Sequence, residues 1–148
     1  MGDWRDNLLE DENRIAELLR ETKRVAVLGI KTEAQADQAA FYVPKYLDGQ
    51  GVEVVPVPVY YPAVQEILGR KVYRTIAEIP GPIDVVDVFR RPADVPQHLE
   101  DIQRKRPRAV WLQMGIRNDQ AAEALARQGI LVVQDRCLMV EGRRHLGR

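Results

Sequence analysis

Five short apolar runs constrain the fold of this chain more than any other feature of its sequence. They are rich in Val or Ile and fall at Arg24–Ile30, Val52–Val57, Ile83–Phe89, Ala109–Met114 and Ile130–Val133. Their apolar residues are continuous rather than alternating, which indicates strands that are covered on both faces. Helical segments separate the runs, so the alternation predicts a parallel sheet with right-handed crossovers.

The helices between the runs are expected at Ala39–Gln50, Ala93–Lys105 and Asp119–Gln128. The first stops near Gly49 or Gly51, because glycine commonly ends helices. Its Pro44 is tolerated if the helix begins near Ala40 or Phe41, where amides lack a helical acceptor. Between residues 59 and 80 we expect an embellished crossover with a short helix over Val64–Leu68. The whole predicts an α/β fold, a Rossmann-like doubly wound five-stranded parallel sheet.

The two ends of the chain lie outside this alternation. Residues 4–21 are expected to form one amphipathic helix, capped by Asp3, with Trp4, Leu8, Ile15 and Leu19 on its apolar stripe. This extension of residues 1–22 is expected to cover the main fold of residues 23–141, although a protein partner is an alternative. Residues 142–148, with Arg143, Arg144, His145 and Arg148, are expected to be a flexible basic tail.

Composition excludes several classes of protein. The chain has 148 residues, which suits one domain, and its 22 basic and 22 acidic side chains cancel, which argues against a nucleic-acid partner. No apolar run approaches the roughly 18 residues of a membrane helix, and the acidic first segment does not resemble a signal peptide. One cysteine excludes an internal disulfide, so we expect a cytoplasmic protein, and two histidines argue against a metal site.

Doubly wound sheets bind ligands beyond the carboxyl ends of their strands. After the first strand, Gly29-Ile30-Lys31-Thr32 leads toward a helix N-terminus that suits phosphate, although a solvated loop remains the alternative. This loop is neither a dinucleotide fingerprint nor a P-loop, because Gly29 is its only glycine. The second strand ends Val57-Pro58-Val59-Tyr60, without the acidic residue that holds a nicotinamide cofactor's ribose, and suits stacking of a purine.

The third and fourth strands end in further candidates. Phe89, Arg90 and Arg91 follow the third strand, and arginine suits phosphate, although ion pairs with nearby acids are the alternative. Gln113, Met114 and Gly115 follow the fourth, where glycine permits close approach of a ligand. Trp111 is expected in the core, and Asn118 is expected to cap the next helix.

Three further residues are weighed for chemistry. Cys137 is expected to be a buried inert thiol rather than a reactive one, although it and Asp135 follow the fifth strand. His98 is expected on a helix away from the strand ends. No acid–base pair is therefore evident.

The series of strand ends resembles the family of small CoA-binding domains, which share their fold with the N-terminal domain of the succinyl-CoA synthetase α subunit. The matching segments run in order from residue 23 to about 141: Val25–Gly29, Tyr42–Leu47, Val54–Val57, Ile67–Gly69, Val86–Arg90, Trp111–Ile116 and Asp135–Cys137. The resemblance implies strand order 3-2-1-4-5 and binding of coenzyme A, with no reaction assigned to the stand-alone proteins.

The resemblance also implies which residues meet the ligand. Those implied to meet phosphates are Gly29, Ile30, Lys31 and Thr32, with Ala40 beside them; those near adenine are Val57, Pro58 and Tyr60; those along the nucleotide and pantetheine are Val88, Phe89, Arg90, Gln113, Met114 and Gly115. Two segments depart from the usual family pattern. The first loop is longer and lacks proline and arginine, and the second strand ends Pro-Val-Pro-Val.

The leading hypothesis is a non-catalytic module that binds CoA or acyl-CoA. An NAD(P) oxidoreductase or a ligase-like enzyme is the second, although the fingerprint glycines and a phosphohistidine or grasp domain are absent. A CoA-responsive regulatory protein with a protein partner, or a homo-oligomer, is the third. Neither a nucleic acid nor a membrane is expected as a partner.

Overall fold

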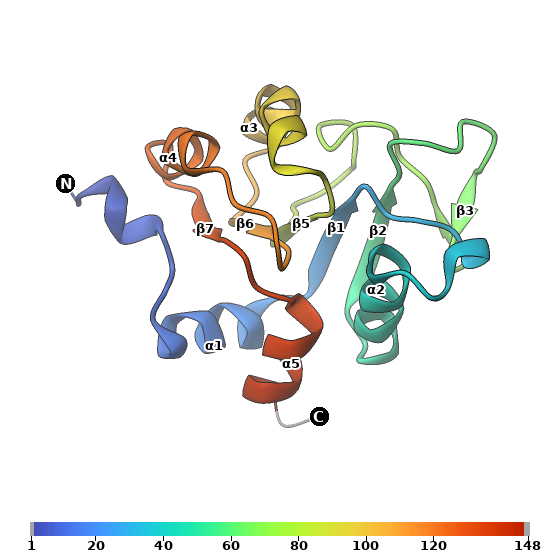
Figure 1. Cartoon of the computed structure of the whole chain (residues 1–148), viewed down its shortest axis with the longest axis horizontal. Helices are drawn as coiled ribbons and strands as arrows, with labels where there is room; N and C mark the ends of the chain where they lie inside the picture. The colour runs from blue at the N-terminus through green and yellow to red at the C-terminus, as the bar shows by residue number, and fades with distance from the viewer. Residues whose placement is uncertain (1, 147–148) are drawn as a thin grey trace.

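The computed structural model describes residues 2–146 and contains one five-stranded parallel sheet (Figure 1). Its strands lie in the order β2, β1, β5, β6, β7, and their bounds are β1 Arg24–Leu28, β2 Glu53–Val57, β5 Val85–Val88, β6 Ala109–Leu112 and β7 Leu131–Val133. Each lies within an apolar run of the sequence. The predicted Rossmann-like doubly wound fold is therefore confirmed.

A short hairpin flanks the β2 edge of this sheet. It joins β3 (Glu66–Ile67) to β4 (Arg70–Lys71), and the amide of Tyr73 just beyond it donates to Pro56 O on β2 at 2.9 Å. Numbered in chain order, the five parallel strands lie in the order 2-1-3-4-5. If the hairpin beside β2 is numbered as the third element, the hairpin, β2, β1, β5 and β6 follow the order 3-2-1-4-5, and β7 comes after them. The prediction of a short helix over Val64–Leu68 is wrong, because Leu68 and Gly69 adopt positive φ values of 55° and 70° and form a tight hairpin turn.

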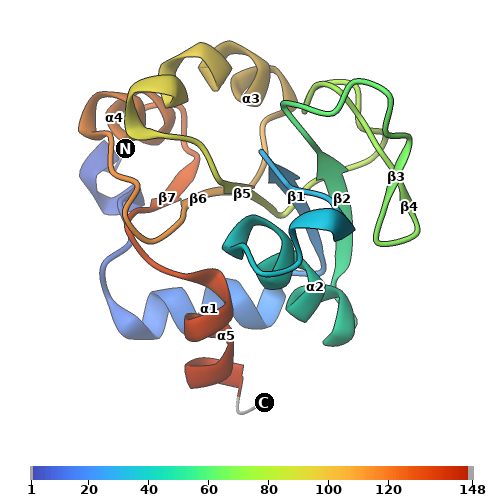
Figure 2. The same ribbon diagram turned by 45° about the vertical axis from the view of Figure 1, so that its right-hand side comes forward.

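Helices cover both faces of the sheet, as Figures 1 and 2 show. One face packs against α3 (Leu99–Lys105), α4 (Asp119–Ala126) and the 3₁₀ helix η3 (Pro92–His98). The other packs against α1 (Glu12–Glu21), α2 (Ala39–Gly49) and α5 (Leu138–Leu146). The continuous helix expected over Ala93–Lys105 divides into η3 and α3, since Pro96 lacks the amide that an α-helix interior requires.

The N-terminal segment is two helices rather than the predicted one. Asp3 caps the 3₁₀ helix η1 (Trp4–Asn7), and Asp11 caps α1 by accepting from two backbone amides. Between them the chain is extended, because the Leu9 amide donates to Val132 O in β7 at 2.8 Å. The buried face of α1 lies on the chain's own core, which confirms that this segment covers the main fold.

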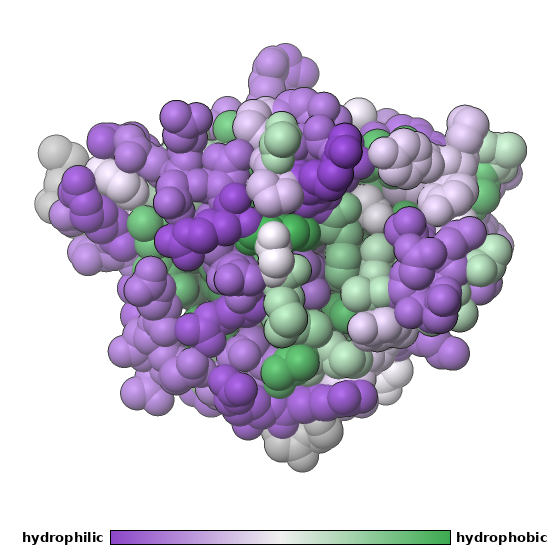
Figure 3. All heavy atoms as spheres, in the orientation of Figure 1, coloured by the Kyte–Doolittle hydropathy of each residue, from purple (hydrophilic) through white to green (hydrophobic). Residues whose placement is uncertain are grey.

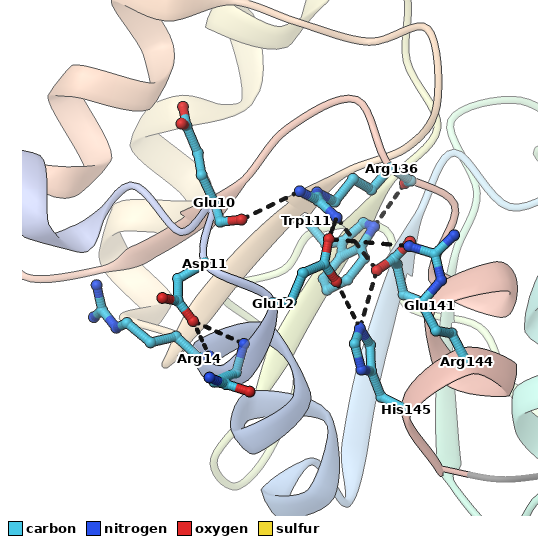
Figure 4. A network of polar contacts seen from close by, with 10 residues as sticks. Glu10, Asp11, Glu12, Arg14, Trp111, Arg136, Glu141, Arg144 and His145 are labelled. Carbon is cyan, nitrogen blue, oxygen red and sulfur yellow. Dashed lines mark hydrogen bonds and ion pairs between the residues drawn. The ribbon is translucent and has the colours of Figure 1, made fainter.

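Residues 138–146 form a helix, so the expectation of a flexible basic tail is wrong for Arg143, Arg144 and His145; Arg148 lies outside the described residues. An ion-pair network ties this helix to the start of α1 (Figure 4). Arg136 lies 2.9 Å from a Glu12 oxygen and 3.3 Å from Glu141, which is 4% exposed. His145 Nε2 lies 2.9 Å from the other Glu12 oxygen. The basic side chains thus neutralise two acids.

Among residues 2–146, no helix has both the length and the apolar character needed to cross a bilayer.

Candidate functional site

The carboxyl ends of β1, β2, β5 and β6 lie at one edge of the sheet because these strands are parallel. From β1 the chain passes to β2 on one side, and it later returns to place β5 on the other. The switch point where ligands bind such sheets therefore lies between β1 and β5. The loops that begin at Gly29 and Phe89 meet there, as expected for the predicted site residues.

Gly29 lies where these two loops approach each other closely. It has a φ of +86°, and a Cβ on it would lie 2.3 Å from Phe89 O, which is far inside van der Waals contact. Its amide donates to Val57 O at 2.8 Å, so it also connects β1 to the end of β2. No other residue fits this conformation and this space together.

The first loop is held by contacts that the sequence did not reveal. Pro44 in α2 has no N–H to offer the carbonyl four residues earlier, and that carbonyl, Ala40 O, accepts instead from Lys31 N at 3.1 Å. Thr32 caps the 3₁₀ helix η2 (Glu33–Gln35) and exchanges hydrogen bonds with Gln35. The amides of Lys31 and Thr32 are thus used within the fold, and the Lys31 side chain and the first turn of α2 remain as groups for an anion.

Arg90 lies against Gly29, and its Cδ is 3.3 Å from the position that a Cβ on Gly29 would take. The side chain is only 10% exposed. Its Nε donates to His98 Nε2 at 3.1 Å, its terminal nitrogen lies 3.7 Å from Asp94, and its guanidinium lies 5.8 Å from the Tyr60 ring centroid. A positive charge is therefore fixed at the switch point.

The contact with Arg90 corrects the prediction for His98, which was expected away from the strand ends. His98 ends η3 and reaches back to the loop after β5. Burial lowers the pKa of His98, and the positive charge of Arg90 lowers it further, against weaker opposing effects of Asp101 and Asp94. The spacing of Arg90 and Asp94, four residues apart, was the available signal for this cluster.

The β6 end of the site is built around two polar contacts. Gln113 is 4% exposed, and its Oε1 accepts from Leu138 N at 3.0 Å, which anchors the start of α5. Asp135 Oδ1 accepts from Gly115 N at 2.6 Å and holds the turn after β6. Met114 on this turn is 64% exposed.

Exposure divides the predicted residues into two groups. The residues with buried side chains are Ile30, Ala40, Val57, Pro58, Val88 and Gln113. Those with exposed or half-buried surface are Gly29, Lys31, Thr32, Tyr60, Phe89, Arg90, Met114 and Gly115. Among the large hydrophobic side chains of residues 2–146, those of Tyr60 and Met114 are the most exposed, at 62% and 64%.

Asp87 lies on β5, two residues before Phe89, and was not singled out from the sequence for any role. Its side chain is fully buried, and both carboxylate oxygens lack a hydrogen-bond partner among residues 2–146. It lies in register with Val27 and Trp111 on the face covered by α1, α2 and α5. Burial raises the pKa of Asp87 well above its usual value.

The other expectations near this edge are settled by burial and contacts. Trp111 is fully buried, and the Asn118 side chain caps α4, as predicted. Cys137 is half-buried at the start of α5 rather than enclosed.

Two features lie away from the strand ends. A groove of about 520 Å³ runs between α1, α2 and α5, with Leu19, Leu47 and Leu138 in its lining. Hydrophobic residues also gather in the middle of the face over α5 and α2 (Figure 3). Oxygen and nitrogen atoms of Glu12, Glu141 and His145 lie within 4.8 Å of one another, but Arg136 contacts both carboxylates, which makes the cluster an ion-pair network.

Comparison with known proteins places this geometry in a family. The uncharacterized protein YneT of Bacillus subtilis is 35% identical over 85% of this chain and 90% of its own. A solved protein of Thermus thermophilus, "cell-free ID.343", is 38% identical with a TM-score of 0.84, covering 92% of this chain and 99% of its own. A hypothetical protein from Pyrococcus horikoshii OT3 is 33% identical with a TM-score of 0.83, covering 93% and 94%.

The family profile described as "CoA binding domain" matches residues 23–143, which include every strand of the sheet and all the loops of the switch point. The chain belongs to the CoA-binding domain family.

Proposed function

We propose that this chain binds CoA or an acyl-CoA at the carboxyl ends of its parallel strands and catalyses no reaction on it. The observation that carries this proposal is the Arg90 guanidinium, which is fixed against Gly29 at the switch point. Arginine binds phosphate through a planar fork of donors, and a guanidinium already held in place loses little freedom when the ligand binds. The Lys31 side chain and the first turn of α2 add positive potential beside it.

We propose that the ligand runs across the strand ends from β2 to β6. Adenine would lie by Val57, Pro58 and Tyr60 at the β2 end, and the phosphates would lie between β1 and β5. The pantetheine arm would then cross β5 and pass Met114 and Gly115 at the β6 end. The exposed surfaces of Tyr60 and Met114 support this direction, because a long ligand with apolar parts would cover both.

A binding role without catalysis is supported by the contacts of the titratable side chains at this edge. His98 accepts from Arg90, Asp94 pairs with Arg90 and Arg91, and Asp135 accepts from Gly115 N. Each of these groups is occupied in holding a loop. The proposal places the protein in the reducing cytoplasm, which suits its unpaired Cys137.

The alternatives differ in their ligands and products. A nicotinamide cofactor would lack an acidic partner for its ribose, since β2 ends in Val57 and Pro58. A regulatory protein that responds to CoA would share the site and differ in having a protein partner. Binding is therefore measured first, for CoA, acetyl-CoA and NAD separately.

Isothermal titration calorimetry of the whole chain tests the proposal. We expect CoA and acetyl-CoA to bind and NAD to bind more weakly, and acetyl-CoA to be recovered intact after incubation. Arg90→Gln should weaken CoA binding, whereas Arg104→Gln, which alters an exposed arginine paired with Glu100 on α3, should not. Absence of heat and of a thermal shift at millimolar CoA would overturn the proposal, and release of acetate from acetyl-CoA would overturn its non-catalytic part.

A further inference from the structure

We infer that His98 is a positioning residue, whose imidazole fixes the orientation of the Arg90 guanidinium for an anionic phosphate of the ligand. This inference rests on the proposed function and assigns a role to a side chain that itself stays beneath the site. His98 is the last residue of η3 and directly precedes α3. Figure 2 shows α3 on the same side of the sheet as α4.

Two donors converge on the same nitrogen of His98. Arg90 Nε lies 3.1 Å from His98 Nε2, and the side-chain amide of Gln97 lies 3.3 Å from it. Because an arginine Nε–H can only donate, Nε2 must carry the lone pair, and the proton of the ring then lies on Nδ1. The geometry therefore requires one tautomer of a neutral imidazole.

The surrounding charges agree with a neutral ring. Burial is the largest cause that lowers the pKa of His98, and Arg90 is the second. Asp101 and Asp94 act in the opposite direction and more weakly. Asp101 is itself engaged, because its two oxygens accept from Ile76 N at 2.7 Å and Ala77 N at 2.9 Å.

No other contact described for Arg90 fixes its plane as well. Its terminal nitrogen is 3.7 Å from Asp94 Oδ2, which is beyond hydrogen-bond distance, and that oxygen accepts from Arg91 Nε at 2.9 Å. The Tyr60 ring, 5.8 Å away, gives attraction without a fixed direction. Within residues 2–146, His98 is thus the hydrogen-bond acceptor of this guanidinium, and the terminal N–H groups are left for a phosphate.

The test compares two substitutions that differ in one property. His98→Gln supplies an oxygen that can accept from Arg90 Nε, whereas His98→Leu has a similar volume and no acceptor. We expect CoA to bind the Leu variant about tenfold more weakly than wild type, and the Gln variant to recover most of that loss. His145→Gln, which alters the other histidine in the α1–α5 network, should leave CoA affinity unchanged.

NMR of the imidazole nitrogens gives a second readout, which would not change if His98 had a purely structural role. The chain has two histidines, so the ¹⁵N signals of His98 are assigned by comparison with the His98→Gln variant. We expect the Nδ1–H tautomer at neutral pH in the ligand-free protein. Arg90→Gln should raise the pKa of His98, because one of the two causes that lower it is removed.

The outcomes separate the two proposals. If wild type binds CoA and the folded Leu variant binds it equally well, or if the ring carries its proton on Nε2, the role of His98 is wrong and the proposed function stands. If wild type does not bind CoA, both are wrong. Thermal unfolding of each variant shows whether it is folded, and a Leu variant that does not fold leaves the Gln variant and the tautomer to decide.

Discussion

Replacement of Asp87 by Asn should change how the stability of this protein depends on pH. The carboxyl of Asp87 is fully buried without a hydrogen-bond partner among the described residues, and burial raises its pKa well above 3.8. An acid whose native pKa is raised contributes stability that is complete below the unfolded pKa and is lost as pH rises toward the native pKa. In the unfolded chain the carboxyl ionises above about pH 4. The Asn variant does not titrate, so it lacks this loss.

The size of the effect follows from the linkage of one proton. Wild type should lose about 1.4 kcal/mol of unfolding free energy per pH unit relative to Asp87→Asn, for as long as the native carboxyl stays protonated. If the native carboxyl stays protonated from pH 5 to pH 7, two such units give about 2.7 kcal/mol. The unpartnered amide of Asn adds a cost that does not vary with pH, so the slope is the informative quantity.

Urea unfolding at pH 5, 6 and 7 measures this slope through tryptophan fluorescence, to which buried Trp111 contributes together with Trp4. Asp37→Asn, at an exposed carboxylate in the first loop, is the matched control and should show no slope relative to wild type. A difference between wild type and Asp87→Asn that stays constant over this pH range would refute the reasoning, because it would mean that the native protein holds no extra proton on Asp87 between pH 5 and pH 7.

Three further predictions concern stability and binding. Gly29→Ala should lower the free energy of unfolding by about 2–5 kcal/mol, because its Cβ would meet Phe89 O at 2.3 Å. Gly115→Ala, at a φ of +85° with open space around it, should lower it by about 1–2 kcal/mol. Equal losses in thermal unfolding would contradict the close contact at Gly29. Glu141→Gln should lower the free energy of unfolding by about 2 kcal/mol, because it weakens the buried end of the α1–α5 network. Glu123→Gln, which alters an exposed ion pair, should lower it by less than about 0.5 kcal/mol in the same denaturant assay. Tyr60→Ala and Met114→Ala should each change stability by less than about 0.5 kcal/mol yet weaken CoA binding in calorimetry; unchanged affinity in both would show that the ligand does not cover these side chains.

Patterns that are local along the chain were predictable from the sequence. The five apolar runs became the strands of the sheet because continuous Val- and Ile-rich segments are stable only where helices cover both faces. The alternation with helices then required parallel strands, and parallel strands bring their carboxyl ends to one edge. That argument was sufficient to name the loops at Gly29, Phe89 and Gln113 as neighbours.

Contacts between distant segments were decided only by the tertiary structure. The predicted N-terminal helix is interrupted at Leu9 because the Leu9 amide pairs with Val132, far along the sequence. The C-terminal segment is helical because Glu12 and Arg136 pair beside Glu141. His98 reaches Arg90 from the end of η3, a contact that helical spacing alone did not indicate.

Burial likewise depends on the whole fold. Asp87 reads in the sequence as one polar residue within a strand, and its carboxyl becomes a buried unpartnered group only when α1, α2 and α5 close over that face. The sequence by itself determined which segments are strands and where a ligand edge must form, because both follow from periodicity and strand direction. The tertiary structure decided which side chains are enclosed, paired or left exposed at that edge, because these depend on atoms that are distant in the chain.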